Sequence, residues 1–439
     1  MSIRPWRTVT VEAASSLIAD CPHSTPQWTA NGVLVLRNTY LKNGRINLDS
    51  PSFTDKENYR QRIRRAIPQG GDLVVSREAP IGEVGLIPPG LQCCLGQRLV
   101  LVRPDPSICN SRFMLYQFIG GDLRRQMLLH EGTGSTVSNL RIPALKALTF
   151  ELPPLAEQQA IAEVLGVLDD KIELNRRMNA TLEELARTIF RSWFVDFDPV
   201  HAKAEGRAPF GMDADTAALF PDSFVSSELG DIPAGWRNEV LCGLTSYLTR
   251  GLSPKYCEEG GLVVLNQKCI RDGRVDYAKA RRHDPSQKPV HGRLLEPWDV
   301  LVNSTGVGTL GRVAQLVQPQ EATIVDSHIT VVRANSELID RVLLGVAMRV
   351  QEPAIEALGE GSTGQTELAR ARLGQIELVV PNQSVQQAFS RLVEPMLVKR
   401  SHNDHESRTL AELRDTLLPK LLSGEITVKA AERELVNAT

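Results

Sequence analysis

The sequence predicts a mixed α/β (α+β) fold in which two tandem strand-rich domains are separated by two long helices. Three observations lead to this prediction. Short motifs recur once along the chain, turn dipeptides separate short apolar runs within each copy, and each copy ends in a long heptad pattern. We expect the two helices to pair as an antiparallel coiled coil, which relates the two copies by a pseudo-two-fold axis.

The composition is that of a globular chain. Its 439 residues suffice for two or three domains, and 42% hydrophobic with 23% charged residues excludes a largely disordered protein. No apolar run has membrane-spanning length, and the segment from Met1 to Trp6 lacks the apolar stretch of a signal peptide. None of the seven cysteines forms a Cys-x-x-Cys pair, so we expect a reducing, cytoplasmic location. The net charge of −2 means that any binding of nucleic acid depends on local basic patches.

The internal repeat keeps its offset between 227 and 230 residues over most of the chain. Coincidence among common apolar motifs is the alternative explanation, and the small drift of the offset argues against it. The recurring motifs are Trp6-Arg7 with Trp236-Arg237, Asn43-Gly44-Arg45 with Asp272-Gly273-Arg274, Asp72-Leu73 with Asp299-Val300, Leu99 to Arg103 with Ile329 to Arg333, Gln158-Gln159 with Gln386-Gln387, and Thr181-Leu182 with Thr409-Leu410.

The first part of each copy, roughly 1–152 and 233–380, combines short strands with one helix. Asn43-Gly44 and Asp272-Gly273 indicate hairpins, because a two-residue turn needs positive φ at its centre. Apolar runs predict strands at 33–36, 73–75, 99–102 and 148–152 in the first copy and at 262–265, 300–302, 329–332 and 376–380 in the second; helices are predicted at 111–129 and 336–351.

The second part of each copy is a long helix, and the first of these begins at Pro153-Pro154. Alternating spacings of three and four residues form a seam with apolar ends and a polar centre. The apolar seam residues are Ile161, Leu165, Leu168, Ile172, Leu182 and Ile189 in the first helix and Val393, Met396, Leu410 and Leu417 in the second; Asn175, Asn179, Arg400 and Asn403 are at the centre. About 40 residues at 1.5 Å each predict a rod of roughly 60 Å. Pro395 should kink or break the second helix.

These elements give a domain plan. The segment 198–232 is rich in Ala, Gly, Pro and Asp and is interpreted as a linker. The predicted parts are a first domain at 1–152, a central helix at 153–197, the linker at 198–232, a second domain at 233–380, a C-terminal helix at 381–424 and a tail at 425–439.

Catalytic signatures are weak in this sequence. Gly306-x-Gly308-x-x-Gly311 follows a predicted strand, as a dinucleotide-binding fingerprint does, but residues 312–317 predict another strand where that fingerprint needs a helix. There is no Gly-Lys-Ser/Thr phosphate loop, and Asp169-x-Lys171 lies in the heptad helix, away from the strand and second carboxylate of a nuclease site. His402-x-x-His405 has no third metal ligand nearby. We therefore expect neither a catalytic nor a metal site.

Basic residues cluster at matching places in the two copies, which suggests two equivalent contacts with a phosphate backbone. A solvated surface explains any single residue about as well. Two Gly-rich loops also match, at 132–136 and 361–365, and their N–H groups could meet phosphates. The candidate DNA-binding residues are Arg60, Arg62, Arg64, Arg65, Arg77, Ser135 and Thr136 in the first copy and Lys268, Arg271, Arg274, Lys279, Arg281, Arg282, Lys288, Arg293, Ser362 and Thr363 in the second.

Taken together, the sequence resembles the DNA-sequence-specificity subunit of type I restriction–modification systems, over nearly the whole chain. The segments that carry the resemblance are Leu152-Pro-Pro-Leu155-Ala-Glu157-Gln158-Gln159, Phe190-Arg-Ser-Trp-Phe-Val-Asp-Phe-Asp-Pro199, Leu219-Phe-Pro-Asp222, Leu229-Gly-Asp-Ile-Pro-Ala-Gly-Trp236 and Leu413-Arg-Asp-Thr-Leu-Leu-Pro-Lys-Leu-Leu-Ser-Gly424. The sequence departs from the family pattern at Asn382-Gln-Ser-Val385, which replaces the Pro154 to Glu157 motif of the first copy.

The resemblance implies a non-catalytic subunit with two target recognition domains, each of which reads one half of a split, asymmetric site on double-stranded DNA. It also implies two methyltransferase subunits and restriction (motor) subunits as partners. S-adenosylmethionine, ATP and Mg²⁺ are then expected on the partners and none on this chain. Two alternatives stay open at this point: a self-sufficient methyltransferase or nuclease that uses Gly306 to Gly311, and a coiled-coil assembly adaptor that does not bind DNA.

Overall fold

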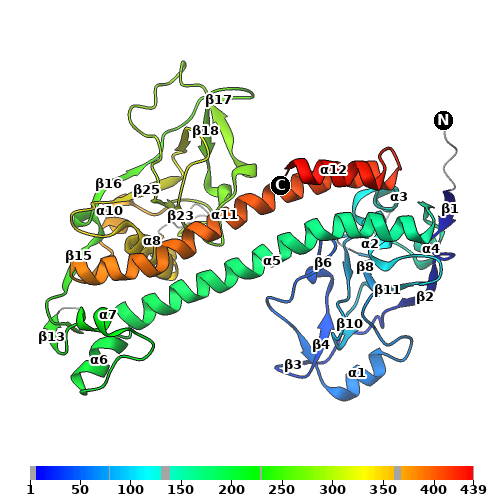
Figure 1. Cartoon of the computed structure of the whole chain (residues 1–439), viewed down its shortest axis with the longest axis horizontal. Coiled ribbons are helices and arrows are strands. Elements are labelled where there is room, and N and C mark those ends of the chain that lie inside the picture. Colours follow the sequence, from blue (N-terminus) through cyan, green and yellow to red (C-terminus); the bar gives the residue numbers. More distant parts are fainter. Residues whose placement is uncertain (1–5, 79, 130–138, 228–229, 360–366, 439) are drawn as a thin grey trace. The chain divides into compact units, whose positions relative to one another are not determined.

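The computed structural model describes residues 6–78, 80–129, 139–227, 230–359 and 367–438 (Figure 1). The chain divides into two compact units. The first unit comprises residues 1–174 and 406–439, and the second comprises residues 175–405. Each unit therefore contains one strand-rich domain and part of both long helices, α5 (Leu155–Phe194) and α11 (Gln383–Leu422). The predicted fold class, two mixed α/β domains with a pair of long helices, is confirmed.

The strand-rich domain of the first unit contains two four-stranded sheets. Its large sheet is antiparallel with the order β2-β11-β8-β9, and its small sheet has the order β10-β4-β7-β3, in which only β10 and β4 are parallel. The strands are β2 (Ser15–Asp20), β3 (Trp28–Thr29), β4 (Val33–Leu36), β7 (Phe53–Thr54), β8 (Leu73–Ser76), β9 (Val84–Leu86), β10 (Cys93–Leu95) and β11 (Leu99–Pro104).

The second unit repeats both sheets in the same order. The large sheet is β16-β25-β22-β23 and the small sheet is β17-β21-β18-β24, again with one parallel pair, β18 and β24. The strands are β16 (Thr245–Arg250), β17 (Tyr256–Cys257), β18 (Leu262–Leu265), β21 (Arg281–His283), β22 (Asp299–Asn303), β23 (Val313–Leu316), β24 (Thr323–Val325) and β25 (Ile329–Ala334). The sequence repeat is therefore also a repeat of strand topology.

Two-stranded elements complete each unit. Arg7–Thr10 (β1) pairs with Thr149–Leu152 (β12), and Arg237–Val240 (β15) pairs with Glu377–Val380 (β26), so each domain closes on its own first strand. The predicted hairpins are confirmed as β5–β6 (Leu41–Lys42 and Arg45–Ile46) and β19–β20 (Ile270–Arg271 and Arg274–Val275). Asn43 and Gly44 have φ of 49° and 82°, and Asp272 and Gly273 have φ of 52° and 68°, as the sequence requires.

The shorter helices differ in part from prediction. The helix predicted at 111–129 is two helices, α2 (Ser111–Gly120) and α3 (Asp122–Leu129), which are separated at Gly121. A Cβ on Gly120 would lie 2.0 Å from Leu418 of α11, so glycine permits this close approach. In the second unit α8 (Arg341–Val350) begins later than predicted, because the Asp340 side chain caps it, and α9 (Glu352–Ala357) follows. The remaining helices are α1 (Lys56–Arg62), α4 (Ile142–Ala147), α10 (Arg370–Gly374) and α12 (Val428–Ala438).

The segment predicted as a linker is folded. It forms α6 (Asp198–Ala204), α7 (Ala214–Ala218) and the strand pair β13 (Phe224–Ser227) and β14 (Gly230–Pro233). Val200 and Phe220 are buried and pack with Trp193 and Trp236 in the core of the second unit. The Ala, Gly and Pro content produced the linker interpretation, whereas a few well-spaced apolar residues determine the structure.

The expected break at Pro395 is absent, because α11 is one helix from Gln383 to Leu422. Proline removes one N–H and leaves the carbonyl of residue i−4 without its helical partner. Pro395 and Arg391, the residue that carries this carbonyl, are both exposed on α11, so the carbonyl need not be buried without a partner. No described helix combines the length and apolar character needed to cross a membrane.

Candidate nucleic-acid interface

Several predicted DNA-binding arginines are structural. Arg62 at the end of α1 is buried, and its guanidinium donates to the carbonyls of Leu95 (2.8 Å), Ser24 (3.1 Å) and Pro22 (3.3 Å). Arg77 is also buried and forms an ion pair with Asp20 at 2.8 Å. Both side chains hold loops of their own domain, and their burial leaves little surface for a contact with DNA.

Four basic residues of the second unit also bond within the chain. The Arg293 guanidinium donates to the carbonyls of Arg250 (2.9 Å) and Gly251 (3.3 Å), and the Lys288 ammonium donates to the Ser253 carbonyl (2.8 Å). Arg282 binds Glu321 through two nitrogens, at 3.0 and 3.1 Å, and Arg274 pairs with Asp404 of α11 at 3.3 Å. These contacts position the side chains for local structure and leave less of their hydrogen-bonding capacity for DNA.

The other predicted basic residues lie on the surface. They are Arg60, Arg64 and Arg65 in the first unit and Lys268, Arg271, Lys279 and Arg281 in the second. Of these, Arg60 is 3.6 Å from Glu57, and Arg65 reaches the carbonyls of Asp20 and Cys21 at 3.3 Å. Ser135, Thr136, Ser362 and Thr363 lie outside the described residues.

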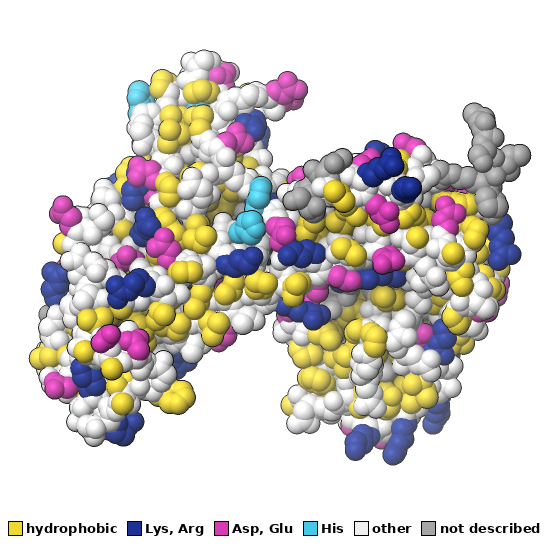
Figure 2. Space-filling view, in the orientation of Figure 1, with side chains coloured by type: hydrophobic (Ala, Val, Ile, Leu, Met, Phe, Trp, Pro, Cys, Tyr) yellow, Lys and Arg dark blue, Asp and Glu magenta, His cyan; other side chains and the backbone are white. Residues whose placement is uncertain are grey.

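The surface cations fall in the segments that form most of the small sheets. Residues 21–71 contain eight Lys and Arg against three Asp and Glu, and residues 251–298 contain nine against six. The whole chain has 50 against 52, so these two equivalent segments carry a positive excess and the remainder is acidic. Figure 2 shows Lys and Arg side chains gathered at the end of the first unit near α1. A positive excess in the equivalent segment of each domain is the electrostatic signature expected for contact with phosphates.

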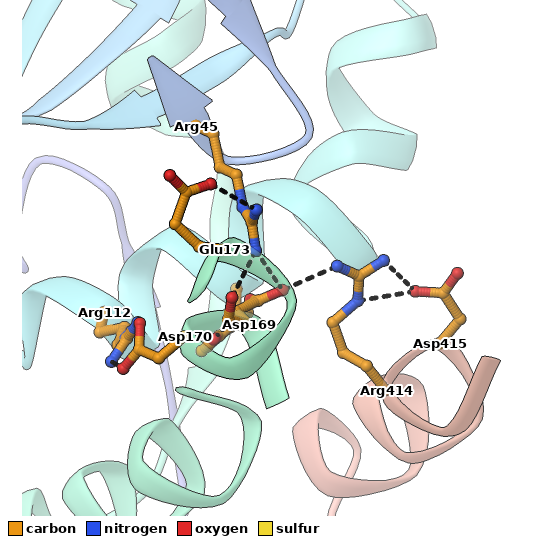
Figure 3. A network of polar contacts seen from close by, with 8 residues as sticks. Arg45, Arg112, Asp169, Asp170, Glu173, Arg414 and Asp415 are labelled. Atoms are coloured by element: carbon orange, nitrogen blue, oxygen red, sulfur yellow. Dashed lines mark hydrogen bonds and ion pairs between the residues drawn. The ribbon is translucent and has the colours of Figure 1, made fainter. Parts of the chain in front are cut away.

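Within the first unit, the hairpin β5–β6 is attached to both long helices by a polar network (Figure 3). Arg45 donates to Glu173 (3.1 Å) and to the Asp169 carbonyl (2.6 Å) of α5. The Asp169 carboxylate accepts from Arg414 of α11 (2.7 Å) and from the Tyr116 hydroxyl (2.8 Å). Burial, together with the neighbouring Asp169 carboxylate, raises the pKa of Tyr116, so this hydroxyl remains a donor. We call Arg45, Asp169 and Arg414 the first hairpin clamp.

The second unit has an equivalent, though not identical, attachment. Arg274, the repeat partner of Arg45, pairs with Asp404 of α11 at 3.3 Å, and Asp404 also accepts from Asn179 of α5 at 2.8 Å. Arg400 of α11 is buried and donates to the Gly273 carbonyl in the hairpin turn at 3.2 Å. We call Arg274, Asp404 and Asn179 the second hairpin clamp. In both units a hairpin arginine thus meets a carboxylate of one long helix that also binds the other helix.

A groove of about 880 Å³ lies beside the second clamp. Its walls come from α5, α8, α11 and the β19–β20 turn, and they include Glu183, Gly273, Arg349 and Arg400. Glu183 pairs with Arg349 at 3.5 Å and with Arg400 at 3.6 Å, and Glu352 pairs with Arg349 at 2.8 Å, so two carboxylates face two guanidinium groups within the groove.

The predicted seam is buried at its apolar ends. Ile161, Leu165, Leu168, Leu410 and Leu417 belong to the core of the first unit, with Ile172 half-buried beside them. Val393 is buried in the second unit, where Ile189 and Met396 pack against the core; Leu182 is half-buried.

The polar centre of the seam is also buried. The Asn403 amide donates to the Asn179 side-chain oxygen at 2.8 Å across the helix pair. In the second unit Asn179 meets Asn403 and Phe190 meets Phe389, and in the first unit Asp169 meets Arg414 and Lys171 meets Glu406. The two helices therefore run antiparallel within each unit.

The repeated Gln158 and Gln386 motif joins each domain to its long helix. The Gln158 side-chain oxygen accepts from the Asn110 backbone N–H (2.8 Å), and its amide donates to the carbonyls of Ile108 and Pro153. The Gln386 side-chain oxygen accepts from the Asp340 backbone N–H (2.7 Å), and its amide donates to the Pro381 carbonyl (2.9 Å). At the point where the second copy departs from the family motif, the Asn382 side chain caps α11 by accepting from the Val385 N–H at 3.0 Å.

The glycine motif at Gly306 does not form a nucleotide cradle. Strands β22 and β23 on either side of it pair antiparallel, and no helix follows the glycines. The Asn303 amide donates to the carbonyls of Gln267 and Thr309, which closes the loop on itself. Among the described residues, no group of three His, Cys, Asp or Glu side chains is placed to hold a metal ion.

The sequence patterns did not predict the hairpin clamps. Arg45 and Arg274 were visible as repeat partners, but Asp169 was considered only in the context of a nuclease motif. The signal that could have identified it is its position next to the seam residue Leu168, where a carboxylate faces the edge of the paired helices.

Comparisons with known proteins agree with this geometry. Residues 27–184 match the family model for the type I restriction modification DNA specificity domain. The chain is 26% identical over 418 residues to the type I restriction enzyme MjaIX specificity subunit of Methanocaldococcus jannaschii, covering 93% of this chain and 88% of that protein. It is 23% identical to the HindI specificity subunit of Haemophilus influenzae, over 75% of this chain and 80% of that protein.

A solved structure shares the fold. The crystal structure of the type I restriction–modification system S subunit from M. genitalium superimposes with a TM-score of 0.57 at 16% identity and covers 96% of this chain and 97% of that one.

Proposed function

This chain belongs to the specificity-subunit family of type I restriction–modification systems, and from that premise we propose that it recognises a bipartite, asymmetric site on double-stranded DNA. In this proposal each strand-rich domain reads one half-site. The two domains share strand topology but differ in sequence, so the two half-sites differ as well. The observation that carries the proposal is the duplicated basic domain, each copy of which is clamped to the paired helices by its own hairpin arginine.

The helix pair then sets the distance between the two half-sites. In this proposal the two half-sites lie about one helical turn apart on the duplex, roughly 34 Å. The central Asn179–Asn403 contact supports this role, because a buried polar pair in a coiled coil fixes its register.

Chemistry is assigned to partners in this proposal. Two methyltransferase subunits would dock on this chain and carry S-adenosylmethionine, and restriction subunits would carry ATP and Mg²⁺. Methylation requires the target base to be flipped into a methyltransferase pocket, so this cytoplasmic, non-catalytic chain would only place that pocket over the correct base.

A selection experiment tests the proposal. The full chain is assembled with the methyltransferase subunit of its own system, incubated with a random duplex library, and the retained DNA is sequenced after an electrophoretic shift. We expect enrichment of two different short motifs at a fixed separation. No enrichment, or a single contiguous motif, would overturn the proposal. As a second arm, the chain alone should transfer no methyl group from radiolabelled S-adenosylmethionine.

A further inference from the structure

Each unit exposes one large aromatic side chain on the edge strand of its small sheet. Trp28 on β3 is 46% exposed and Tyr256 on β17 is 40% exposed. The two residues are repeat partners at an offset of 228, and β3 and β17 are the equivalent outer strands of their sheets. An exposed aromatic on an open strand edge favours unwanted pairing, so its presence at the same place in both copies calls for a physical explanation.

A guanidinium covers each of these rings. The Arg37 guanidinium carbon is 5.4 Å from the Trp28 ring centroid, and that of Arg281 is 3.4 Å from the Tyr256 ring centroid. Both arginines are on the surface, where such a contact contributes little to stability. The stability of the fold therefore does not explain why both copies have an arginine over an exposed ring.

The two arginines come from different strands. Arg37 follows β4, and its repeat partner is Asn266; Arg281 is in β21, and its repeat partner is Ser52. Positions 37 and 52 are neighbours, because an Arg37 nitrogen is 3.5 Å from the Ser52 hydroxyl oxygen. Each copy thus has one arginine at one of two adjacent positions, and in both copies it lies over the aromatic ring. The arrangement of groups is retained although the residues that provide it differ.

The surroundings indicate the chemistry of the ligand. Both pairs lie in the segments 21–71 and 251–298, which carry the positive excess of the chain. Within each unit the small sheet is at the end of the domain away from the long helices (Figure 1). A ring face beside a guanidinium suits a polyanion with apolar surfaces, because the ring can pack on deoxyribose or a thymine methyl while the guanidinium donates to phosphate or to guanine O6 and N7.

We propose that Trp28 with Arg37, and Tyr256 with Arg281, are the DNA-contacting pairs of the two recognition domains, each acting on its own half-site. This inference rests on the proposed function and adds to it the residues that make the contact. The ring holds the guanidinium in one orientation before DNA arrives, and the different positions of the two arginines give the two domains different donor geometry.

The test uses the full chain with its methyltransferase partner and the duplex that the wild-type complex selects from the random library. Affinity is measured for the intact duplex and for two duplexes in which one half-site at a time is scrambled. We expect Trp28→Ala and Arg37→Ala each to weaken binding to the intact duplex roughly 10- to 100-fold. In both variants, scrambling one particular half-site should weaken binding less than it does for the wild type, whereas scrambling the other half-site should weaken binding as much as it does for the wild type. Tyr256→Ala and Arg281→Ala should do the same for the other half-site.

Two further variants separate contact with DNA from a structural role. Phe210→Ala removes an exposed aromatic from the 198–232 segment and should leave affinity unchanged. The double variant Arg37→Asn with Ser52→Arg moves the guanidinium to the position that the second copy uses, and it should recover most of the affinity lost in Arg37→Ala. Thermal unfolding of each variant verifies that the chain is folded.

The outcomes distinguish this inference from the proposed function. If the wild-type complex selects no bipartite sequence, the proposed function fails. If it does, and folded Trp28→Ala and Tyr256→Ala bind both intact and scrambled duplexes as the wild type does, the contact pairs are disproved. If the variants do weaken binding, the salt dependence of Arg37→Ala and Arg281→Ala assigns the guanidinium contact: a smaller salt slope with unchanged base preference indicates phosphate, and altered base preference indicates a base edge.

Discussion

At the scale of single residues, arginine has two separate uses in this chain. Arg62 and Arg77 are buried and bond to carbonyl or carboxylate groups of their own domain, whereas Arg60 and Arg64 are on the surface. A sequence run of basic residues contains both kinds. The tertiary contacts that bury Arg62 involve residues 33 and more positions away, and no local pattern indicates them.

The first prediction concerns the surface arginines of α1. Replacing Arg60 and Arg64 with Glu should weaken DNA binding and lower the salt slope by about one for each phosphate contact removed. Affinity measured at several salt concentrations verifies this. Arg433→Glu in α12, also exposed, is the matched control and should leave the slope as in the wild type. Equal effects from the control and the α1 variants would contradict the assignment.

Cysteine reactivity gives a second prediction. Burial raises the pKa of Cys93 and Cys109 to about 12 and of Cys94 and Cys269 to about 11. These thiols remain protonated at pH 8, so a thiol reagent should modify exposed Cys242 first and the buried thiols only after unfolding. Cys242→Ser should remove the fast phase.

The same shifts fix the direction of the pH effect on stability. The thiols ionise near the ordinary value of 9.0 in the unfolded chain and only at higher pH in the folded one. Their contribution to stability is therefore full below about pH 9 and is lost between pH 9 and 12. Melting temperature should fall as pH rises above 9; a melting temperature that rises over this interval would contradict these assignments.

At the scale of elements, periodicity predicted more than composition did. The heptad spacing gave both long helices and the polar centre of their seam, and the turn dipeptides gave both hairpins. Proline and glycine led to the wrong predictions of a helix break at Pro395 and of a linker at 198–232. The destabilisation that these residues cause depends on whether the affected backbone faces water or a core. The hairpin clamps could not be derived, since they join residues more than 100 positions apart.

The third prediction concerns the buried amides at the seam centre. Asn403→Leu removes the donor to Asn179 and leaves a buried acceptor without its partner, so it should destabilise the second unit by roughly 1–3 kcal/mol. The double variant Asn179→Leu with Asn403→Leu removes the unpaired acceptor but also the Asn179 donor to Asp404, so it should recover only part of the lost stability. Thermal unfolding of the three proteins is the measurement. A double variant less stable than the single one would show that the amides stabilise the pair beyond their mutual bond.

At the scale of the whole molecule, α5 and α11 are each continuous and each belong in part to both compact units. Every strand-rich domain therefore packs on segments from both helices. The core of the first unit contains Leu165 and Leu417, and the core of the second contains Phe190 and Phe389. Comparison of the repeats predicted two copies with one helix each, but not that the first unit would combine residues 1–174 with residues 406–439.

The fourth prediction tests the helix pair as a spacer. One heptad inserted between residues 174 and 175 and another between 405 and 406 keeps the seam in phase and adds about 10.5 Å. The selected half-sites should then lie about three base pairs further apart. The same seven residues inserted after Gly206, an exposed turn, should leave the spacing unchanged. Unaltered spacing in the double-heptad protein would exclude the helices as the determinant.

The discontinuity of the first unit has a consequence for biosynthesis. Residues 1–174 leave the ribosome first, yet their helix lacks its partner until residues 406–422 follow, and residues 175–405 form a complete unit in the meantime. At about 5–20 residues per second this delay lasts tens of seconds. The core of the first unit lacks Leu410, Leu417 and Leu421 during that time, so newly made chains should depend on chaperones, and chains truncated before residue 406 should aggregate through the apolar surface left open.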